Sequence, residues 1–459
     1  MSSKMGKHWR WIPSLYFAEG LPYVVVMTLS VIMYKRLGLS NSEVALYTGW
    51  LYLPWVIKPF WSPLVDLLKS KRWWIVTMQL LIGAGFAGVA LALPTPHFVR
   101  LTLAALWLVA FSSATHDISA DGFYILALKP HQQSFFVGIR STFYRIATVV
   151  GQGVLVMGAG YLEKRSGNIA LAWSAIFLLL ALLFLLFSLL HKRVLPTPLK
   201  DSEHLSSVEI EGDRTNKSSG IGSVFRGYIE VLSSYFKKEG IVPALLFLLF
   251  YRFSEAQLVK MVSPFLLDSR EVGGLGLSTQ MVGVAYGTVG IIALTIGGIV
   301  GGMVVSVGGF KRWLWPMALS ISLPSFAFVY LATVQPTSLF IINLSIFVEQ
   351  LGYGFGFTAY MLFMLYFSQG RYESAHYAIS TAFMALGMML PGMAAGVLQE
   401  MMGYKLFFWW IMGGFILTFL VTASIKIDPN FGKKERKLSN TPGSQNEPSS
   451  SNNKKNSLS

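Results

Sequence analysis

The stretch LKSKRWW (68–74) returns 240 residues later as GGFKRWLW (308–315), each copy directly after a long apolar run. Two other pairs occur in the same order along the chain: GLSNSEVALYTG (38–49) with GLSTQMVGVAYG (276–287), and YFAEG (16–20) with YRFSEA (251–256). Motifs that recur in order at a nearly constant spacing indicate a chain built from repeated structural units. The sequence therefore predicts two related halves in parallel orientation.

The composition indicates that both halves lie in a membrane. Apolar residues make up 53% of the 459 residues, only 13% are charged, and the mean hydropathy is +0.54. Soluble domains average about 25% charged residues. The apolar residues form runs of the length that a helix needs to cross a bilayer. We predict an all-α membrane protein with twelve transmembrane helices, near 11–34, 44–66, 73–94, 99–128, 135–161, 170–191, 243–267, 280–306, 313–333, 338–367, 374–398 and 406–427.

These runs divide the chain into four parts. We predict a six-helix N-terminal half (1–191), a cytoplasmic linker (192–242), a six-helix C-terminal half (243–427) and a disordered tail (428–459). With twelve spans, most clusters of Lys and Arg fall on one side, whereas Lys35, Arg36, Lys164 and Arg165 are exceptions. Basic loops stay in the cytoplasm. We therefore expect both termini to be cytoplasmic.

Several classes of function are disfavoured by the residues that are present. The chain has no cysteine, and its seven histidines lack metal-ligand spacing. No nucleophile–base pair or nucleotide loop is evident, and the polar loops are too short for a catalytic domain. The net charge of +15 follows the topology and does not indicate nucleic-acid binding. We expect no enzyme activity, metal, cofactor or nucleic acid, and a monomer whose partners are a small solute, protons and lipids.

The parallel repeat of six-helix halves resembles the major facilitator superfamily, in which substrate binds near the midplane between the halves. Helices 1, 4, 7 and 10 line the cavity in that superfamily. Because a charge at the bilayer centre costs about 3 kcal/mol on insertion scales, intramembrane polar residues are candidates for function. Those we interpret as substrate-binding are Tyr16, Glu19, Tyr23, Tyr124, Gln152, Arg252, Glu255, Lys260, Glu349, Gln350 and Tyr353.

Two of these candidates, Arg252 and Lys260, suit an anionic group such as a carboxylate or phosphate. An alternative is that Arg252 only neutralises Glu255, three residues further along the same helix.

Predicted helix 4 carries two acids on one stripe, Asp117 and Asp121, in the stretch HDISADG (116–122). At 1.5 Å per residue, Asp117 matches Arg145 of helix 5 in depth, and Asp121 matches Arg140. We predict two ion pairs. For Asp121 two roles remain open, a clamp at the cytoplasmic gate or a proton site; for Asp117 we favour the structural role. Glu19 is a further candidate for coupling or gating.

The loop after helix 2 carries a predicted conformational motif. Asp66 lies five residues before Lys71, where the superfamily's loop motif places its Asp, and we expect it to hold a basic residue in the closed state. The other members are Lys58, Arg72, Lys311 and Arg312. For Lys58 the simpler interpretation is that its amine reaches the membrane interface.

Four motifs together resemble AmpG-type muropeptide permeases, which are related to acetyl-CoA transporters: YFAEGLPY (16–23), KPFWSPLVD (58–66), SSATHDISADGF (112–123) and FYRIATVVGQG (143–153). The chain departs from that pattern at His116 and Phe123, where members often have Gln and Trp. The resemblance implies a cytoplasmic-membrane importer, driven by the proton gradient, for N-acetylglucosamine–anhydro-N-acetylmuramic acid with or without its peptide. It also implies roles for Lys58, Asp66, Asp117, Asp121 and Arg145.

We therefore predict a proton-coupled importer of muropeptides for cell-wall recycling. The alternative is the same fold carrying another anionic solute, such as an acyl-CoA, a peptide or an organic acid, inward or as an exporter. A membrane enzyme or sensor is the alternative from another class.

Overall fold

The computed structural model describes residues 8–128, 130–196, 221–429 and 431–432, and this part of the chain is α-helical without strands. The spans of the first half are α2–η1–α3 (Ile12–Val24, Val25–Leu29, Ser30–Arg36), α4–α5 (Asn41–Trp50, Leu53–Leu68), α6 (Lys71–Ala92), α7 (Phe98–Ala127), α8–η2–α9 (Pro130–Val149, Val150–Val154, Leu155–Ser166) and α10 (Ile169–Val194). The elements η1 and η2 are short π-helical segments within these spans.

The second half follows a separate helix, α12 (Ile221–Phe236). Its spans are α13–α14 (Ile241–Phe250, Phe253–Leu267), α15–η4–α16 (Thr279–Val282, Gly283–Gly290, Ile291–Gly308), α17–η5–α18 (Phe310–Ser322, Leu323–Ser325, Phe326–Val334), α19 (Leu339–Ser368) and α20 (Glu373–Ser424). A short 3-10 helix, η3 (Arg270–Val272), lies between α14 and α15.

The number of membrane passes agrees with the prediction. Ten helical segments of the described chain are long and apolar enough to cross a membrane. One of them, α20, turns back at Gly403, whose φ of 72° is not helical, so it makes two passes. The broken helix α4–α5 makes one more. The described residues therefore form twelve passes, as the hydropathy predicts.

The repeated GLS motif has a local structural explanation. In each copy the glycine has a positive φ, 91° at Gly38 and 65° at Gly276, a conformation that glycine adopts without steric cost. The serine two residues later caps a helix: the Ser40 hydroxyl accepts from the Glu43 amide, and the Ser278 hydroxyl accepts from the Met281 amide. The motif thus turns the chain and starts the second span of each half.

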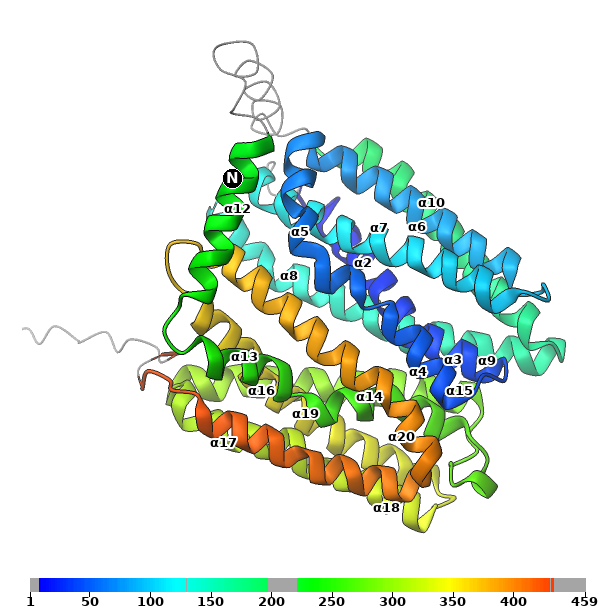
Figure 1. The fold of residues 1–459 in the computed structure, drawn as a ribbon. Helices are drawn as coiled ribbons and strands as arrows, with labels where there is room; N and C mark the ends of the chain where they lie inside the picture. The colour runs from blue at the N-terminus through cyan, green and yellow to red at the C-terminus, as the bar shows by residue number, and fades with distance from the viewer. Residues whose placement is uncertain (1–7, 129, 197–220, 430, 433–459) are drawn as a thin grey trace, which may run out of the picture.

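The two halves lie side by side, the first above the second in Figure 1. Within them, α6 packs between α7 and α10, and α19 packs against α16 and α17. Contacts between the halves are made by α4 and α5 with α20, by α9 with α15, and by η2 with η4. We call the end of the molecule that carries α12 and the end of α20 the near face, and the opposite end the far face.

The contact between η2 and η4 is backbone on backbone, and we call it the glycine seam. A Cβ atom on Gly287 would lie 1.9 Å from the carbonyl oxygen of Gln152. In the adjoining contact between α9 and α15, a Cβ atom on Gly160 would lie 2.4 Å from the amide nitrogen of Gln280. Only glycine permits such close approach.

The segment predicted as a linker (192–242) is partly helical. Helix α10 continues to Val194, and α12 lies against the start of α20. The Ser234 hydroxyl is 2.9 Å from Nε2 of His376, and the Tyr235 hydroxyl is 3.0 Å from that of Ser380. Residues 197–220 and 433–459, where the rest of the linker and the tail were predicted, lie outside the described residues. The boundaries of the four parts therefore stay a prediction.

Candidate functional site

The ion pair predicted between Asp121 and Arg140 is present, toward the end of the molecule that we call the near face. Oδ1 of Asp121 lies 2.5 Å from Nη2 of Arg140, and the same nitrogen is 4.0 Å from Oε1 of Glu19. The guanidinium carbon of Arg140 lies 4.5 Å from the centre of the Tyr16 ring. The side chains of Asp121 and Arg140 are 45% and 29% exposed. The pair joins α7 to α8, and this contact favours the clamp for Asp121 over the proton site.

The ion pair predicted between Asp117 and Arg145 is wrong. Oδ2 of Asp117 lies 3.5 Å from Nζ of Lys58 and accepts a hydrogen bond of 3.2 Å from the Trp55 indole. Arg145 is exposed and donates to the Thr295 hydroxyl at 3.5 Å, across the boundary between the halves. Matching depths fix the height of a residue along a helix but not the direction it faces, and this part of α7 packs against α5. Lys58 therefore reaches an acid rather than only the membrane interface.

The second half contains a buried cation. Arg252 lies in the break between α13 and α14 and donates to the Tyr353 hydroxyl. Its guanidinium carbon lies 4.6 Å from the centre of the Phe357 ring and 5.3 Å from that of the Tyr353 ring. No ion pair joins Arg252 to Glu255 among the described residues, so the alternative that Arg252 only neutralises Glu255 is not observed. Arg252 is thus a cation held by aromatic rings, able to accept an anion.

Two buried acids lie close to this cation. Glu255 is 0% exposed, and neither carboxylate oxygen has a hydrogen-bond partner among the described residues. Glu349, 2% exposed, accepts a hydrogen bond of 2.9 Å from the side chain of Gln350. Glu255 lies one turn after Arg252, and Glu349 lies one turn before Tyr353, which Arg252 contacts, so the two acids flank the same cation.

The remaining predicted binding residues divide into two sets. Lys260 donates to the Thr48 hydroxyl of α4 at 3.0 Å and lies 5.4 Å from the Tyr52 ring, so it connects the halves. The Tyr23 ring packs against Trp55, with ring centres 5.2 Å apart. In contrast, Gln152 donates to Thr28 at 3.0 Å, and the Tyr124 hydroxyl donates to the Gln133 carbonyl at 2.5 Å. The polar groups of this second set are engaged within the first half.

The predicted conformational motif differs between its two copies. Lys71 is buried, and its Cε would lie 2.8 Å from a Cβ atom on Gly122, beside Asp121. Arg72 donates to the Lys192 carbonyl. In the second copy, Lys311 and Arg312 are exposed. The side chain of Asp66 lies outside the described residues, so its role stays a prediction.

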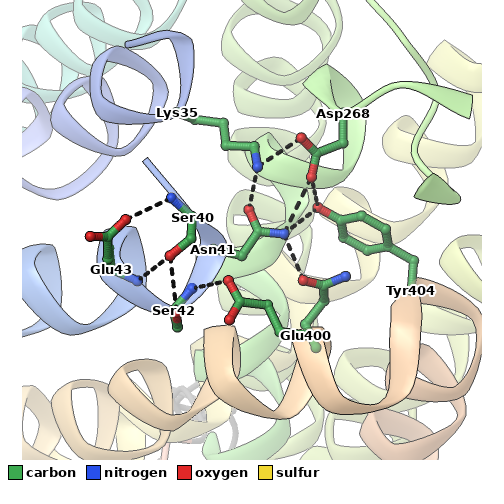
Figure 2. Close-up of polar contacts among 9 residues, drawn as sticks. Lys35, Ser40, Asn41, Ser42, Glu43, Asp268, Glu400 and Tyr404 are labelled. Atoms are coloured by element: carbon green, nitrogen blue, oxygen red, sulfur yellow. Dashed lines mark hydrogen bonds and ion pairs between the residues drawn. The ribbon is translucent and has the colours of Figure 1, made fainter. Parts of the chain in front are cut away.

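Sequence reasoning missed a polar network at the far face, which we call the far-face latch (Figure 2). Nζ of Lys35 lies 2.7 Å from Oδ1 of Asp268, which comes from the other half. The Asn41 side-chain amide donates to Gln399 at 2.6 Å and to Tyr404 at 2.9 Å, and Tyr404 donates to Asp268 at 2.6 Å. These contacts join the two halves at the far face. The one signal in the sequence was that Lys35 departs from the charge bias.

A second network missed by the sequence crosses the first half. His191 is fully buried, with Nε2 2.9 Å from the Ser14 hydroxyl and Nδ1 2.9 Å from Oε1 of Gln79. The Gln79 amide nitrogen is 2.9 Å from Nε2 of His116. This chain of contacts ties α2, α6, α7 and α10 together beside Asp117.

Comparisons with known proteins agree with this fold. Residues 14–376 match the Major Facilitator Superfamily. The "Putative transporter AmpG 4" of Rickettsia conorii is 27% identical, over 86% of this chain and 90% of its own. The anhydromuropeptide permease of Escherichia coli K12 is 23% identical, over 86% and 74%.

Solved structures show the same fold at low sequence identity. Nucleoside transporter NupG has a TM-score of 0.66 at 14% identity, covering 91% of this chain and 98% of its own. The D-xylose–proton symporter has a TM-score of 0.65 at 14% identity, covering 92% and 99%. The predicted resemblance to AmpG-type permeases is confirmed by the relatives above, and the chain is a transporter and not an enzyme. It belongs to the major facilitator superfamily.

Proposed function

We propose that this protein imports N-acetylglucosamine–anhydro-N-acetylmuramic acid, with or without its peptide, across the cytoplasmic membrane together with protons. The observation that carries the proposal is Arg252, a buried guanidinium among aromatic rings with no carboxylate paired to it in the described chain. Such a group binds a carboxylate through two parallel hydrogen bonds. The muramic acid and its peptide supply carboxylates of this kind.

The neighbouring residues support a sugar-containing substrate. Tyr353 and Phe357 offer ring faces beside Arg252, and Tyr52 offers another beside Lys260. Flat apolar rings with a polar edge suit sugar rings, which combine apolar faces with hydroxyl groups. A relative named as an anhydromuropeptide permease supports this substrate class.

The proposed direction of transport follows from the two faces. We assign the near face to the cytoplasm because the basic loops predict that side. With the far-face latch closed, the structure then corresponds to a transporter that releases its substrate inward. Asp121 with Arg140, and Asp117 with Lys58, act in this proposal as clamps within the first half.

The test is uptake of labelled N-acetylglucosamine–anhydro-N-acetylmuramic acid into proteoliposomes with an imposed pH gradient. We expect accumulation that a protonophore abolishes and that excess unlabelled muropeptide, but not acetyl-CoA, competes away. Accumulation that ignores the protonophore would contradict proton coupling. Competition by acetyl-CoA or simple organic acids alone would contradict the substrate and favour the alternative solutes.

A further inference from the structure

We propose that Glu255 and Glu349 form a carboxyl pair that holds the transported proton, in the second half of the protein and apart from Asp121. The inference rests on the proton coupling proposed above and names the groups that perform it. Both residues had been predicted to bind substrate, as neighbours of Arg252.

Glu255 is isolated from both water and hydrogen-bond partners in the described chain. It lies in the first turn of α14, is wholly buried, and neither oxygen has a hydrogen bond among the described residues. An ionised carboxylate removed from water without a partner costs several kcal/mol, so such a group takes up a proton instead. Glu255 is thus suited to carry a proton.

Glu349 is the second buried acid beside Arg252 and lies on α19. Two carboxylates that share a buried site do not both ionise readily, because the second charge repels the first. Gln350 donates a hydrogen bond to Glu349, which stabilises the anion there, whereas Glu255 receives none. The pair is therefore unequal, with the charge on Glu349 and the proton on Glu255.

The surrounding titratable groups do not remove this need for a proton. Those within electrostatic range of Glu255 are Arg252 just before its helix, Glu349 and Tyr353 of α19, and Tyr286 of η4. Lys260, further along α14, donates to Thr48. Five titratable groups on other elements packed against α14 have partners elsewhere: Lys35 with Asp268, Glu43 with Ser40, His376 with Ser234, Glu400 with Ser42, and Tyr404 with Asp268.

The intramembrane acids of the first half already have cations beside them. Asp121 and Asp117 are paired with Arg140 and Lys58, and Glu19 is 4.0 Å from Arg140. A proton carried by one of these acids would first have to displace its cation. Glu255 has no such competitor within ion-pair distance in the described chain.

The arrangement also couples the proton to an anionic solute. Arg252, one turn before Glu255, is the positive charge nearest in sequence to the pair. When a substrate carboxylate binds Arg252, that charge is neutralised, and an anion at Glu255 becomes less stable. Binding of the solute therefore strengthens binding of the proton, and by linkage the proton strengthens binding of the solute. The proton enters as H⁺ from water on one side, forms an O–H bond at Glu255, and returns to water on the other side.

The test compares wild type, Glu255→Gln, Glu349→Gln and the control Glu271→Gln in proteoliposomes. Glu271 is exposed beside the far face and belongs to neither the site nor the latch. A gradient of one pH unit sustains roughly tenfold accumulation at one proton per solute. With labelled N-acetylglucosamine–anhydro-N-acetylmuramic acid, we expect this from wild type and the control, and a ratio of about one from Glu255→Gln. Retained tenfold accumulation by Glu255→Gln would overturn the pair, whereas a wild type that ignores the gradient would refute the coupling itself.

A second readout does not depend on transport. Infrared spectroscopy at neutral pH detects the carbonyl stretch of a buried protonated carboxyl group, which we expect in wild type and the control and not in Glu255→Gln. An unchanged band in that variant overturns the proposal. If Glu255→Gln does not fold, Glu349→Gln serves instead: without the neighbouring charge the proton is held less tightly, so the band and the accumulation both decrease. If neither decreases, the two residues do not act as a pair.

Discussion

The far-face latch gives a prediction that can be worked out from the structure, because its members come from both halves. In Asp268→Asn the amide oxygen still accepts from Tyr404, but the charge 2.7 Å from Lys35 is lost. A hydrogen bond to a charged group contributes about 1.5–3 kcal/mol. The Lys35 and Asp268 side chains are 14% and 16% exposed, and screening by water reduces the loss to about 1–2 kcal/mol.

This loss falls on the state with the far face closed, because opening that face separates the two partners. A change of about 1–2 kcal/mol alters a population ratio roughly 5- to 30-fold. We therefore expect Asp268→Asn to increase the fraction of molecules that are open at the far face by about this factor.

The assay uses the absence of cysteine from the chain, so that one introduced thiol is the only one. Ala45 lies one turn after Asn41 on α4 and is fully buried in this structure. The thiol of Ala45→Cys should react with a membrane-impermeant maleimide only when the far face opens. We expect Asp268→Asn to raise its labelling rate roughly 5- to 30-fold.

Two comparisons decide whether the reasoning holds. Glu271→Gln, three residues further along, also removes an acid from the far face and should leave the rate unchanged, since its side chain is exposed. Lys35→Met should raise the rate, and the double variant with Asp268→Asn should be no faster than the faster single variant. An unchanged rate in Asp268→Asn, or additive effects in the double variant, would refute the latch.

Three further predictions concern the interior. Lys58→Met leaves the partly buried Asp117 without its cation and should lower thermal stability more than the double variant with Asp117→Asn, in which the uncompensated charge is gone; equal losses would contradict the pair. Arg252→Lys keeps the charge but loses the planar fork and stacking, so the muropeptide concentration for half-maximal uptake should rise about tenfold, at roughly 1–2 kcal/mol; an unchanged value would place the substrate elsewhere. Gly287→Ala should destabilise the fold by about 1–3 kcal/mol through overpacking, whereas Gly302→Ala, where nothing lies within 4 Å, should not; equal melting temperatures of the two variants would contradict a tight seam.

The sequence predicted features that depend on local order along the chain. Hydropathy gave the twelve passes, and the repeated GLS motif marked the turn and cap before the second span of each half. The Asp121–Arg140 pair could be predicted because its helices are consecutive and both residues face each other. For Asp117 the same depth argument failed, because the direction it faces depends on how α5 packs.

Contacts between the halves could not be predicted from one sequence. Asn41 bonds to residues more than 350 positions away, and no local pattern identifies such partners. His191 lies at the end of an apolar run, and nothing in that run identifies Ser14 and Gln79 as the partners of its buried ring. The isolation of Glu255 is likewise a property of three-dimensional packing, since in the sequence its nearest cation is only three residues away.

The glycine seam between η2 and η4 sets an energetic limit on the transport cycle. Each square ångström of apolar surface exposed to water costs about 25 cal/mol, so a boundary of leucines would hold the halves in one position. Helix backbone whose amides are already bonded internally offers little such surface when it separates. The two orientations of the halves can thus remain close in free energy, and a few polar contacts at the far face decide between them. A larger side chain at Gly287 would consequently slow exchange between the orientations, even in a variant that reached the membrane folded.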